Sequence, residues 1–121
     1  MKSKVLKTIV CSPIVRRHFN GKGRLLNTHG DYIKASREIA RETKTPFVDM
    51  EAYTRKLVSR LEPEKSKVLF TMKKSGLDST HLCHNGAREV ALLFVKGVKK
   101  QKLEITKYFI SAEKTTKVMN Y

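Results

Sequence analysis

The stretch VLKTIVCSPI, residues 5–14, decides the class of fold that this chain can adopt. It is rich in β-branched residues, carries one charge at Lys7 and ends beside Pro13. A short apolar run of this kind predicts a mostly buried strand of the type found in parallel sheets. Because ligand-contacting loops of α/β folds begin where such strands end, Ser12 and the residues after it are expected on the site side.

Downstream of this strand, the pattern predicts a helix and then a second short strand. A polar loop over residues 15–29 leads to a helix over 31–43, with Asp31 as its expected N-cap. The inward face of this helix is predicted from helical spacing. Its members are Tyr32, Ile33, Ser36, Ile39 and Ala40. Residues 45–50 then form a short, apolar segment that predicts a buried strand.

A second helix is predicted over residues 51–61, with Asp49 positioned to cap it. Residues 62–70 predict a break and then a short helix, because Pro63 suits a first helical turn. Residues 71–77 are expected to form a basic loop.

The last long helix is predicted to begin at His84 or Asn85 and to end in the basic run over 99–102. Positive charge at that end suits the helix dipole. Residues 103–110 alternate loosely and predict a late strand, and residues 114–121 predict a frayed tail.

This order of elements predicts an α/β fold with a parallel sheet. Two or three strands make a thin sheet, whereas parallel sheets are normally covered by helices on both faces. We therefore expect the chain to be part of a larger doubly wound domain. Loss of the rest of such a domain exposes a strand edge and helix faces, which favours self-association.

Composition indicates one soluble globular domain, with 40% hydrophobic and 31% charged residues among 121. The net charge of +15 favours polyanions such as nucleic acid or acidic glycans. No recognition helix or RNA-binding signature accompanies it, so a solvated basic surface is the preferred interpretation. Cys11 and Cys83 are expected to be free thiols. No apolar run predicts a signal peptide or a membrane span, which gives a cytoplasmic location by default.

The motif Asp78-x-x-His81 is the main candidate for chemistry. An imidazole can act as general base while a carboxylate fixes its tautomer and stabilises the imidazolium. The alternative is that Asp78 caps a helix and His81 is a structural histidine near the helix start. The spacing alone favours this alternative. The pair also needs a nucleophile from elsewhere.

Other chemistry is less well supported by the residue pattern. His18, His29, His81 and His84 with the two cysteines lack a tight ligand pair such as Cys-x-x-Cys, so no metal is expected. No cofactor motif is expected either. Cys83 lies only two residues from His81, which is awkward for a nucleophile paired with that base.

Taken in order, the motifs resemble the C-terminal half of an SGNH (GDSL-type) hydrolase, and most closely the rhamnogalacturonan acetylesterase branch of carbohydrate esterases. The similar stretches span about residues 5–97. They are Ser12-Pro13-Ile14 with Arg17 and Phe19-Asn20-Gly21-x-Gly23, Asn27 to Tyr32, Thr45 to Asp49, Leu61 to Lys67, and Asp78 to Leu82 with Gly86-Ala87.

The resemblance implies the C-terminal part of a flavodoxin-like three-layer α/β/α fold over residues 1–98, followed by a basic extension over 99–121. It implies that Asp78 and His81 are the acid and base of a Ser-His-Asp triad that deacetylates a pectic polysaccharide. The family's Gly-Asp-Ser block, with its nucleophile, and the glycine and asparagine of its oxyanion hole have no counterpart in this chain. Cys83-His84-Asn85 also replaces the family's usual residues there, and the loop before Asp78 is shorter.

Three functional hypotheses follow. The first is a truncated acetylesterase with little activity alone, and the second is a non-catalytic basic module for nucleic acid or acidic polysaccharide. The third is a split enzyme whose missing half comes from a complementary N-terminal segment. Arg16 and Arg17, on the loop after the first strand, are candidates for contact with an acidic glycan, although a solvated basic loop is the preferred interpretation.

Overall fold

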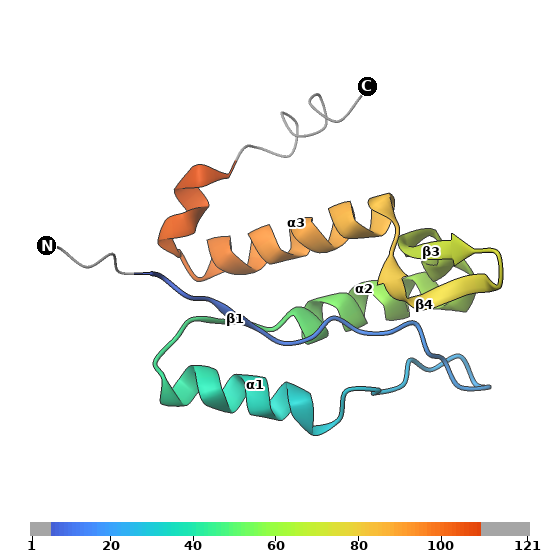
Figure 1. Ribbon diagram of the computed structural model, residues 1–121, viewed down its shortest axis with the longest axis horizontal. Helices are drawn as coiled ribbons and strands as arrows, with labels where there is room; N and C mark the ends of the chain where they lie inside the picture. Colours follow the sequence, from blue (N-terminus) through green and yellow to red (C-terminus); the bar gives the residue numbers. More distant parts are fainter. Residues whose placement is uncertain (1–5, 110–121) are drawn as a thin grey trace, which may run out of the picture.

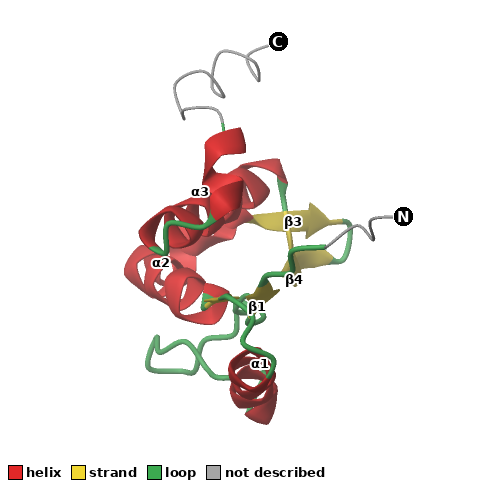
Figure 2. Cartoon of the chain, turned by 90° about the vertical axis from the view of Figure 1, so that its left-hand side faces the viewer, coloured by secondary structure: helices red, strands yellow, loops and turns green. Residues whose placement is uncertain are grey.

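The computed structural model describes residues 6–109. A parallel pair of very short strands, β1 (Val10–Cys11) and β2 (Phe47–Val48), lies between helices on its two faces. Helix α1 (Asp31–Glu42) covers one face. Helices α2 (Met50–Lys65) and α3 (His84–Lys100) lie on the other, as Figures 1 and 2 show. The predicted α/β class with a parallel sheet is confirmed.

The strand pair has a register of Val10 opposite Phe47 and Cys11 opposite Val48. The N–H of Val10 donates to the carbonyl of Pro46 at 2.9 Å, and the N–H of Ser12 donates to the carbonyl of Val48 at 3.2 Å. The strand is much shorter than the 5–14 run predicted for it. Among residues 6–109 only one strand, β2, pairs with it, and β2 is itself two residues long.

Helix α1 begins where predicted, but two details differ. Gly30, with a φ of 53°, occupies the N-cap position without a side-chain hydrogen bond, so Asp31 is the first helical residue and does not cap it. The inward face is also narrower than predicted. Ala40 is buried, whereas Tyr32 is 78% exposed and Ile39 is 49% exposed. A two-stranded sheet is too narrow to cover the whole apolar face of this helix.

Helix α2 confirms the predicted cap and the predicted break. The Asp49 side chain accepts a hydrogen bond from the N–H of Ala52 at 3.2 Å. Glu62 has a φ of 62°, which interrupts the helix just before Pro63. A 3₁₀ turn over Ser66–Leu69 then leads into the next strand.

Two segments were predicted wrongly. Residues 71–77 do not form a loop, because β3 (Phe70–Lys73) and β4 (Gly76–Leu82) make an antiparallel hairpin. Gly76 supplies the tight turn with a φ of 120°. The late strand is instead a 3₁₀ helix over Glu104–Tyr108. Residue 110 and the predicted tail lie outside the described residues. The domain boundary expected at residue 98 stays a prediction.

The described core consists of two clusters, and α2 contributes residues to both. Val15, Val58, Leu69 and Phe70 form the first cluster, next to the hairpin. The second is built on Val48, Met50 and Val98. Two glycines of α3 allow the helix to approach its neighbours closely: a Cβ on Gly86 would overlap the Leu69 carbonyl, and one on Gly97 would lie 2.8 Å from Cγ1 of Val48.

Replacing Gly86 by alanine is expected to destabilise the fold by about 1–3 kcal/mol, because the new methyl group forces α3 away from the backbone at Leu69. Urea denaturation followed by circular dichroism measures this change. Gly21→Ala is the matched control, since no atom lies within 4 Å of its added Cβ. Equal stability of the two variants would contradict the close approach.

Candidate active site

Asp78 and His81 lie in a bulge of β4. Phe70 of β3 pairs with Leu82 and Met72 pairs with Leu77, so residues 78–81 stand opposite Thr71 alone. The extra residues are held by the Asp78 carboxylate. Its Oδ1 accepts hydrogen bonds from the N–H groups of Thr80 at 2.8 Å and His81 at 2.9 Å. A short acidic side chain thus organises the backbone that carries the histidine.

The second carboxylate oxygen of Asp78 meets the imidazole. Oδ2 lies 2.9 Å from Nδ1 of His81. An Nδ1–H that donates to this oxygen leaves Nε2 as the acceptor, which is the tautomer that a general base requires. The Asp78 side chain is only 9% exposed, whereas that of His81 is 73% exposed. The base therefore presents its free nitrogen to solvent while its partner is shielded.

Lys73 joins this pair from β3. Its Nζ lies 2.8 Å from the same Oδ2 that contacts His81. The Lys73 ammonium, the backbone N–H groups of His81 and Thr80, and the His81 imidazole together hold the pKa of Asp78 far below its usual range. The carboxylate is therefore charged at any pH at which an esterase would work. Sequence reasoning missed Lys73, because its contact depends on a hairpin that was predicted as a loop.

The loop after β1 reaches this bulge through Arg17. The N–H of Arg17 donates to the carbonyl of Ser79 at 2.8 Å. Its guanidinium donates from Nε to Ser66 Oγ at 3.1 Å and also donates to the carbonyl of Pro63. Arg17 thereby fastens the loop to both the end of α2 and the bulge, whereas Arg16 is exposed.

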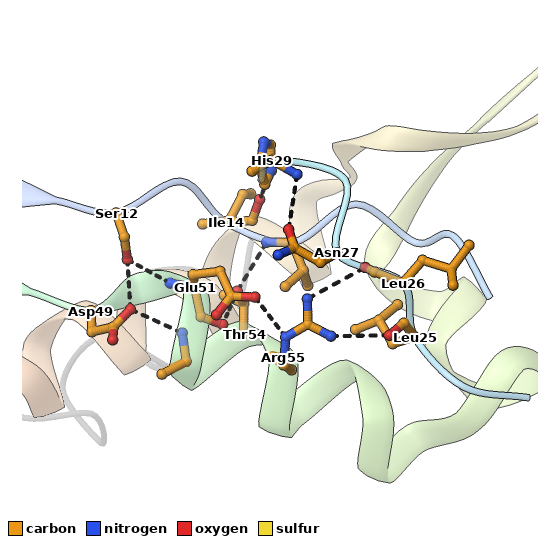
Figure 3. Close-up of polar contacts among 12 residues, drawn as sticks. Ser12, Ile14, Leu25, Leu26, Asn27, His29, Asp49, Glu51, Thr54 and Arg55 are labelled. Carbon is orange, nitrogen blue, oxygen red and sulfur yellow. Dashed lines mark hydrogen bonds and ion pairs between the residues drawn. The ribbon is translucent and has the colours of Figure 1, made fainter. Parts of the chain in front are cut away.

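A second polar network fixes the rest of that loop on α2 (Figure 3). Ser12 Oγ donates to Asp49 Oδ1 at 2.8 Å and accepts from the N–H of Glu51 at 2.9 Å. Arg55 donates to Glu51 at 2.6 Å and to the carbonyls of residues 25 and 26 at 3.1 and 3.3 Å. The spacing of four residues between Glu51 and Arg55 on a helix could have predicted this ion pair from the sequence. The network joins the carboxyl ends of both parallel strands.

The remaining sequence candidates are not brought together. His29 is turned to the carbonyl of Ile14, with Nε2 at 2.7 Å, and Cys83 Sγ donates to the carbonyl of Val68 at 3.1 Å. Cys11 and Cys83 are both free thiols. Within residues 6–109, no three metal-ligating side chains converge. In the same range, no serine hydroxyl is hydrogen-bonded to Nε2 of His81.

An open pocket lies at the other end of the strand pair. Ile9 and Pro46, which precede β1 and β2, line it together with the segment around Leu103. The Asp78–His81 pair lies instead beside the loops that leave the carboxyl ends of the strands. In the described part of the chain, no helix is long and apolar enough to cross a membrane.

Two proteins of similar sequence are named as a rhamnogalacturonan acetylesterase and a probable one. The chain is 31% identical to rhamnogalacturonan acetylesterase RhgT of Bacillus subtilis strain 168, in an alignment covering 93% of this chain and 52% of that protein. It is 28% identical to the probable rhamnogalacturonan acetylesterase YesY of the same strain, covering 90% of this chain and 50% of the relative. The resemblance inferred from the ordered motifs is confirmed, and the chain spans about half the length of these relatives.

The fold has a solved counterpart. The crystal structure of protein YxiM from Bacillus subtilis matches with a TM-score of 0.70 at 23% identity, over 81% of this chain and 27% of the other. This likeness concerns the fold alone, and it agrees with the expected partial flavodoxin-like arrangement. No protein-family model matches the chain.

Replacing Asp78 by asparagine is expected to reduce stability at neutral pH more than at pH 3. A carboxyl whose folded-state pKa is lowered contributes its full stability above its unfolded pKa, near 4, and loses it progressively as the pH falls from that value toward the lower folded-state pKa. Denaturant titrations at both pH values test this, with Asp31→Asn at the exposed start of α1 as control. A pH-independent difference between wild type and Asp78→Asn would contradict the assignment.

Proposed function

We propose that this chain is the acid–base half of a carbohydrate acetylesterase, with His81 as general base and Asp78 as the residue that orients it. The contact between His81 Nδ1 and Asp78 Oδ2, at 2.9 Å, carries this proposal. The similarity to two rhamnogalacturonan acetylesterases supports the class of reaction.

In the proposed reaction, a serine hydroxyl supplied from outside residues 6–109 donates its proton to Nε2 of His81 as its oxygen attacks the acetyl carbonyl carbon. Asp78 stabilises the imidazolium that forms. The imidazolium then returns the proton to the departing sugar oxygen, which leaves an acetylated serine. Water, deprotonated by the same histidine, releases acetate and restores the serine.

The proposed substrate is an acetylated acidic polysaccharide. Both relatives are named for rhamnogalacturonan, and this chain has a net charge of +15, which attracts polyanions. Arg16 is an exposed basic residue next to Arg17 on the loop that reaches the proposed site, whereas Arg17 bonds to the end of α2 and Lys73 bonds to Asp78. Arg16 is therefore the better candidate for contact with a uronate. No observation separately favours a nucleic-acid-binding module.

The chain alone is expected to have little activity. No serine of residues 6–109 bonds to Nε2 of His81, so the covalent route needs a nucleophile from elsewhere, and lack of an oxyanion hole would cost about 3–4 kcal/mol of transition-state stabilisation. His81 can then only activate water weakly. Acetate release by the purified chain that disappears in His81→Ala would overturn this expectation.

A fusion enzyme tests the proposed roles directly. The segment of RhgT that this chain does not match is joined ahead of Met1, and acetate release from acetylated rhamnogalacturonan is measured. The fusion is expected to be active. His81→Ala is expected to lower kcat by about 10³-fold or more, and Asp78→Asn by about 10²–10⁴-fold.

His84→Ala is the matched control, because His84 is an exposed neighbouring imidazole without the Asp78 contact. It is expected to leave kcat within about twofold of the unmodified fusion. An active fusion that tolerates His81→Ala would refute the role given to His81.

A further inference from the structure

The strand β1 has one edge that no described strand covers. The N–H groups of Val10 in β1 and of Ser12, which follows it, point toward the segment of β2 and bond to the carbonyls of Pro46 and Val48. In a parallel ladder, alternate residues point to opposite edges, so the N–H and C=O of Cys11 point away from β2. Within residues 6–109 the sheet contains only β1 and β2. This open edge is a row of backbone groups able to pair with another strand.

On one face of the sheet, the side chain of Cys11 beside the open edge is exposed. Cys11 lies opposite Val48, so the two side chains share a face. Val48 is 1% exposed and packs with Val98 of α3, whereas Cys11 is exposed. Helix α3 therefore lies over β2 and leaves β1 uncovered at Cys11 on this face.

On the other face, α1 presents an apolar stripe toward the same edge. Arg37 identifies the flank of α1 that faces β2, because it bonds to Asp49 at 2.9 Å and lies over the Phe47 ring. Tyr32 and Ile39, seven residues apart, lie on the opposite flank and are 78% and 49% exposed. They consequently border the side of β1 that has no neighbouring strand among the described residues. Figure 2 shows α1 end-on below β1.

The position of this edge matters for the site. A strand added parallel to β1 would end level with Ser12, at the start of the loop whose Arg17 bonds to Ser79 in the bulge. Loops at the carboxyl ends of neighbouring parallel strands converge. A nucleophile on such a loop would enter on the same side as His81, whose Nε2 has no hydrogen-bond partner among the described residues.

We propose that the open edge of β1, with the exposed stripe of Tyr32 and Ile39, is the docking surface for a polypeptide equivalent to the half of the acetylesterases that this chain does not match. That polypeptide adds a strand parallel to β1 and covers the stripe with its own apolar side chains. The chain spans 52% and 50% of its two relatives, so the complement is of similar size. The inference rests on the proposed function for its choice of occupant.

The test is co-expression of the full chain with the unmatched segment of RhgT as a separate, tagged polypeptide. A 1:1 complex is expected on size-exclusion chromatography with light scattering. In a Cys83→Ser background, the complex is expected to slow alkylation of Cys11 at least tenfold. The double variant Tyr32→Asp, Ile39→Asp is expected to weaken association at least tenfold.

The matched control is Val68→Asp, an exposed apolar position on the 3₁₀ turn next to the hairpin, which should bind normally. Circular dichroism verifies that each variant is folded. No complex, or a complex indifferent to the Tyr32 and Ile39 changes, overturns the proposal. So does a homodimer of this chain that forms through the stripe in place of the complex.

The fusion enzyme separates the two proposals. An active fusion without association of the separate halves would refute the docking surface and leave the esterase assignment standing. A stable 1:1 complex that releases no acetate, together with an inactive fusion, would support the docking surface and refute the esterase assignment.

Discussion

The parallel pairing of β1 with β2 is the constraint on which the rest of the structure depends. It brings together two segments 37 residues apart, and the Ser12–Asp49 hydrogen bond closes the pair at its carboxyl end. Because both strands run the same way, their exit loops lie side by side. One exit leads directly into α2, and the other is the long loop that Arg17 and Arg55 fasten in place. The candidate site lies beside these exits.

The Asp78 carboxylate also holds several segments together, within the bulge of β4. One oxygen shapes the bulge by accepting two backbone N–H groups, and the other oxygen is shared by an imidazole and an ammonium. The same interactions that hold the backbone also keep the carboxylate ionised. Since Lys73 competes with His81 for one oxygen, the hairpin influences how strongly Asp78 can support a protonated imidazole. The Asp78 side chain therefore serves both the local fold of the bulge and the proposed chemistry.

Among residues 6–109, the sheet formed by β1 and β2 is packed unequally on its two sides. Close approach at Gly86 and Gly97 lets α3 pack tightly on the hairpin and on β2. The opposite side of the sheet has no equivalent: Cys11 stays exposed, and α1 buries only one of the apolar positions predicted for its inner face. One part of a larger α/β unit would have this asymmetry, in which α3 packs over β2 while the edge of β1 has no neighbouring strand among the described residues.

The sequence by itself determined the α/β class, the approximate position of each main helix, the Asp49 cap, the break at Glu62 and the motif that holds Asp78 and His81. These features depend on local spacing, capping and periodicity, which a single segment carries within itself. The ordered motifs also identified the resemblance to acetylesterases before any comparison of folds.

Only the tertiary structure decided the hairpin and the contact of Lys73 with Asp78. It also decided the bonds of Arg17 to Ser66 and Ser79, and the exposure of Tyr32 and Ile39. Residues 71–77 looked like a loop because their strand character arises from pairing across a bulge, not from an apolar alternation. The exposure of α1 likewise depends on how many strands lie above it. A helix can encode an apolar face, but the width of the sheet decides how much of that face is buried.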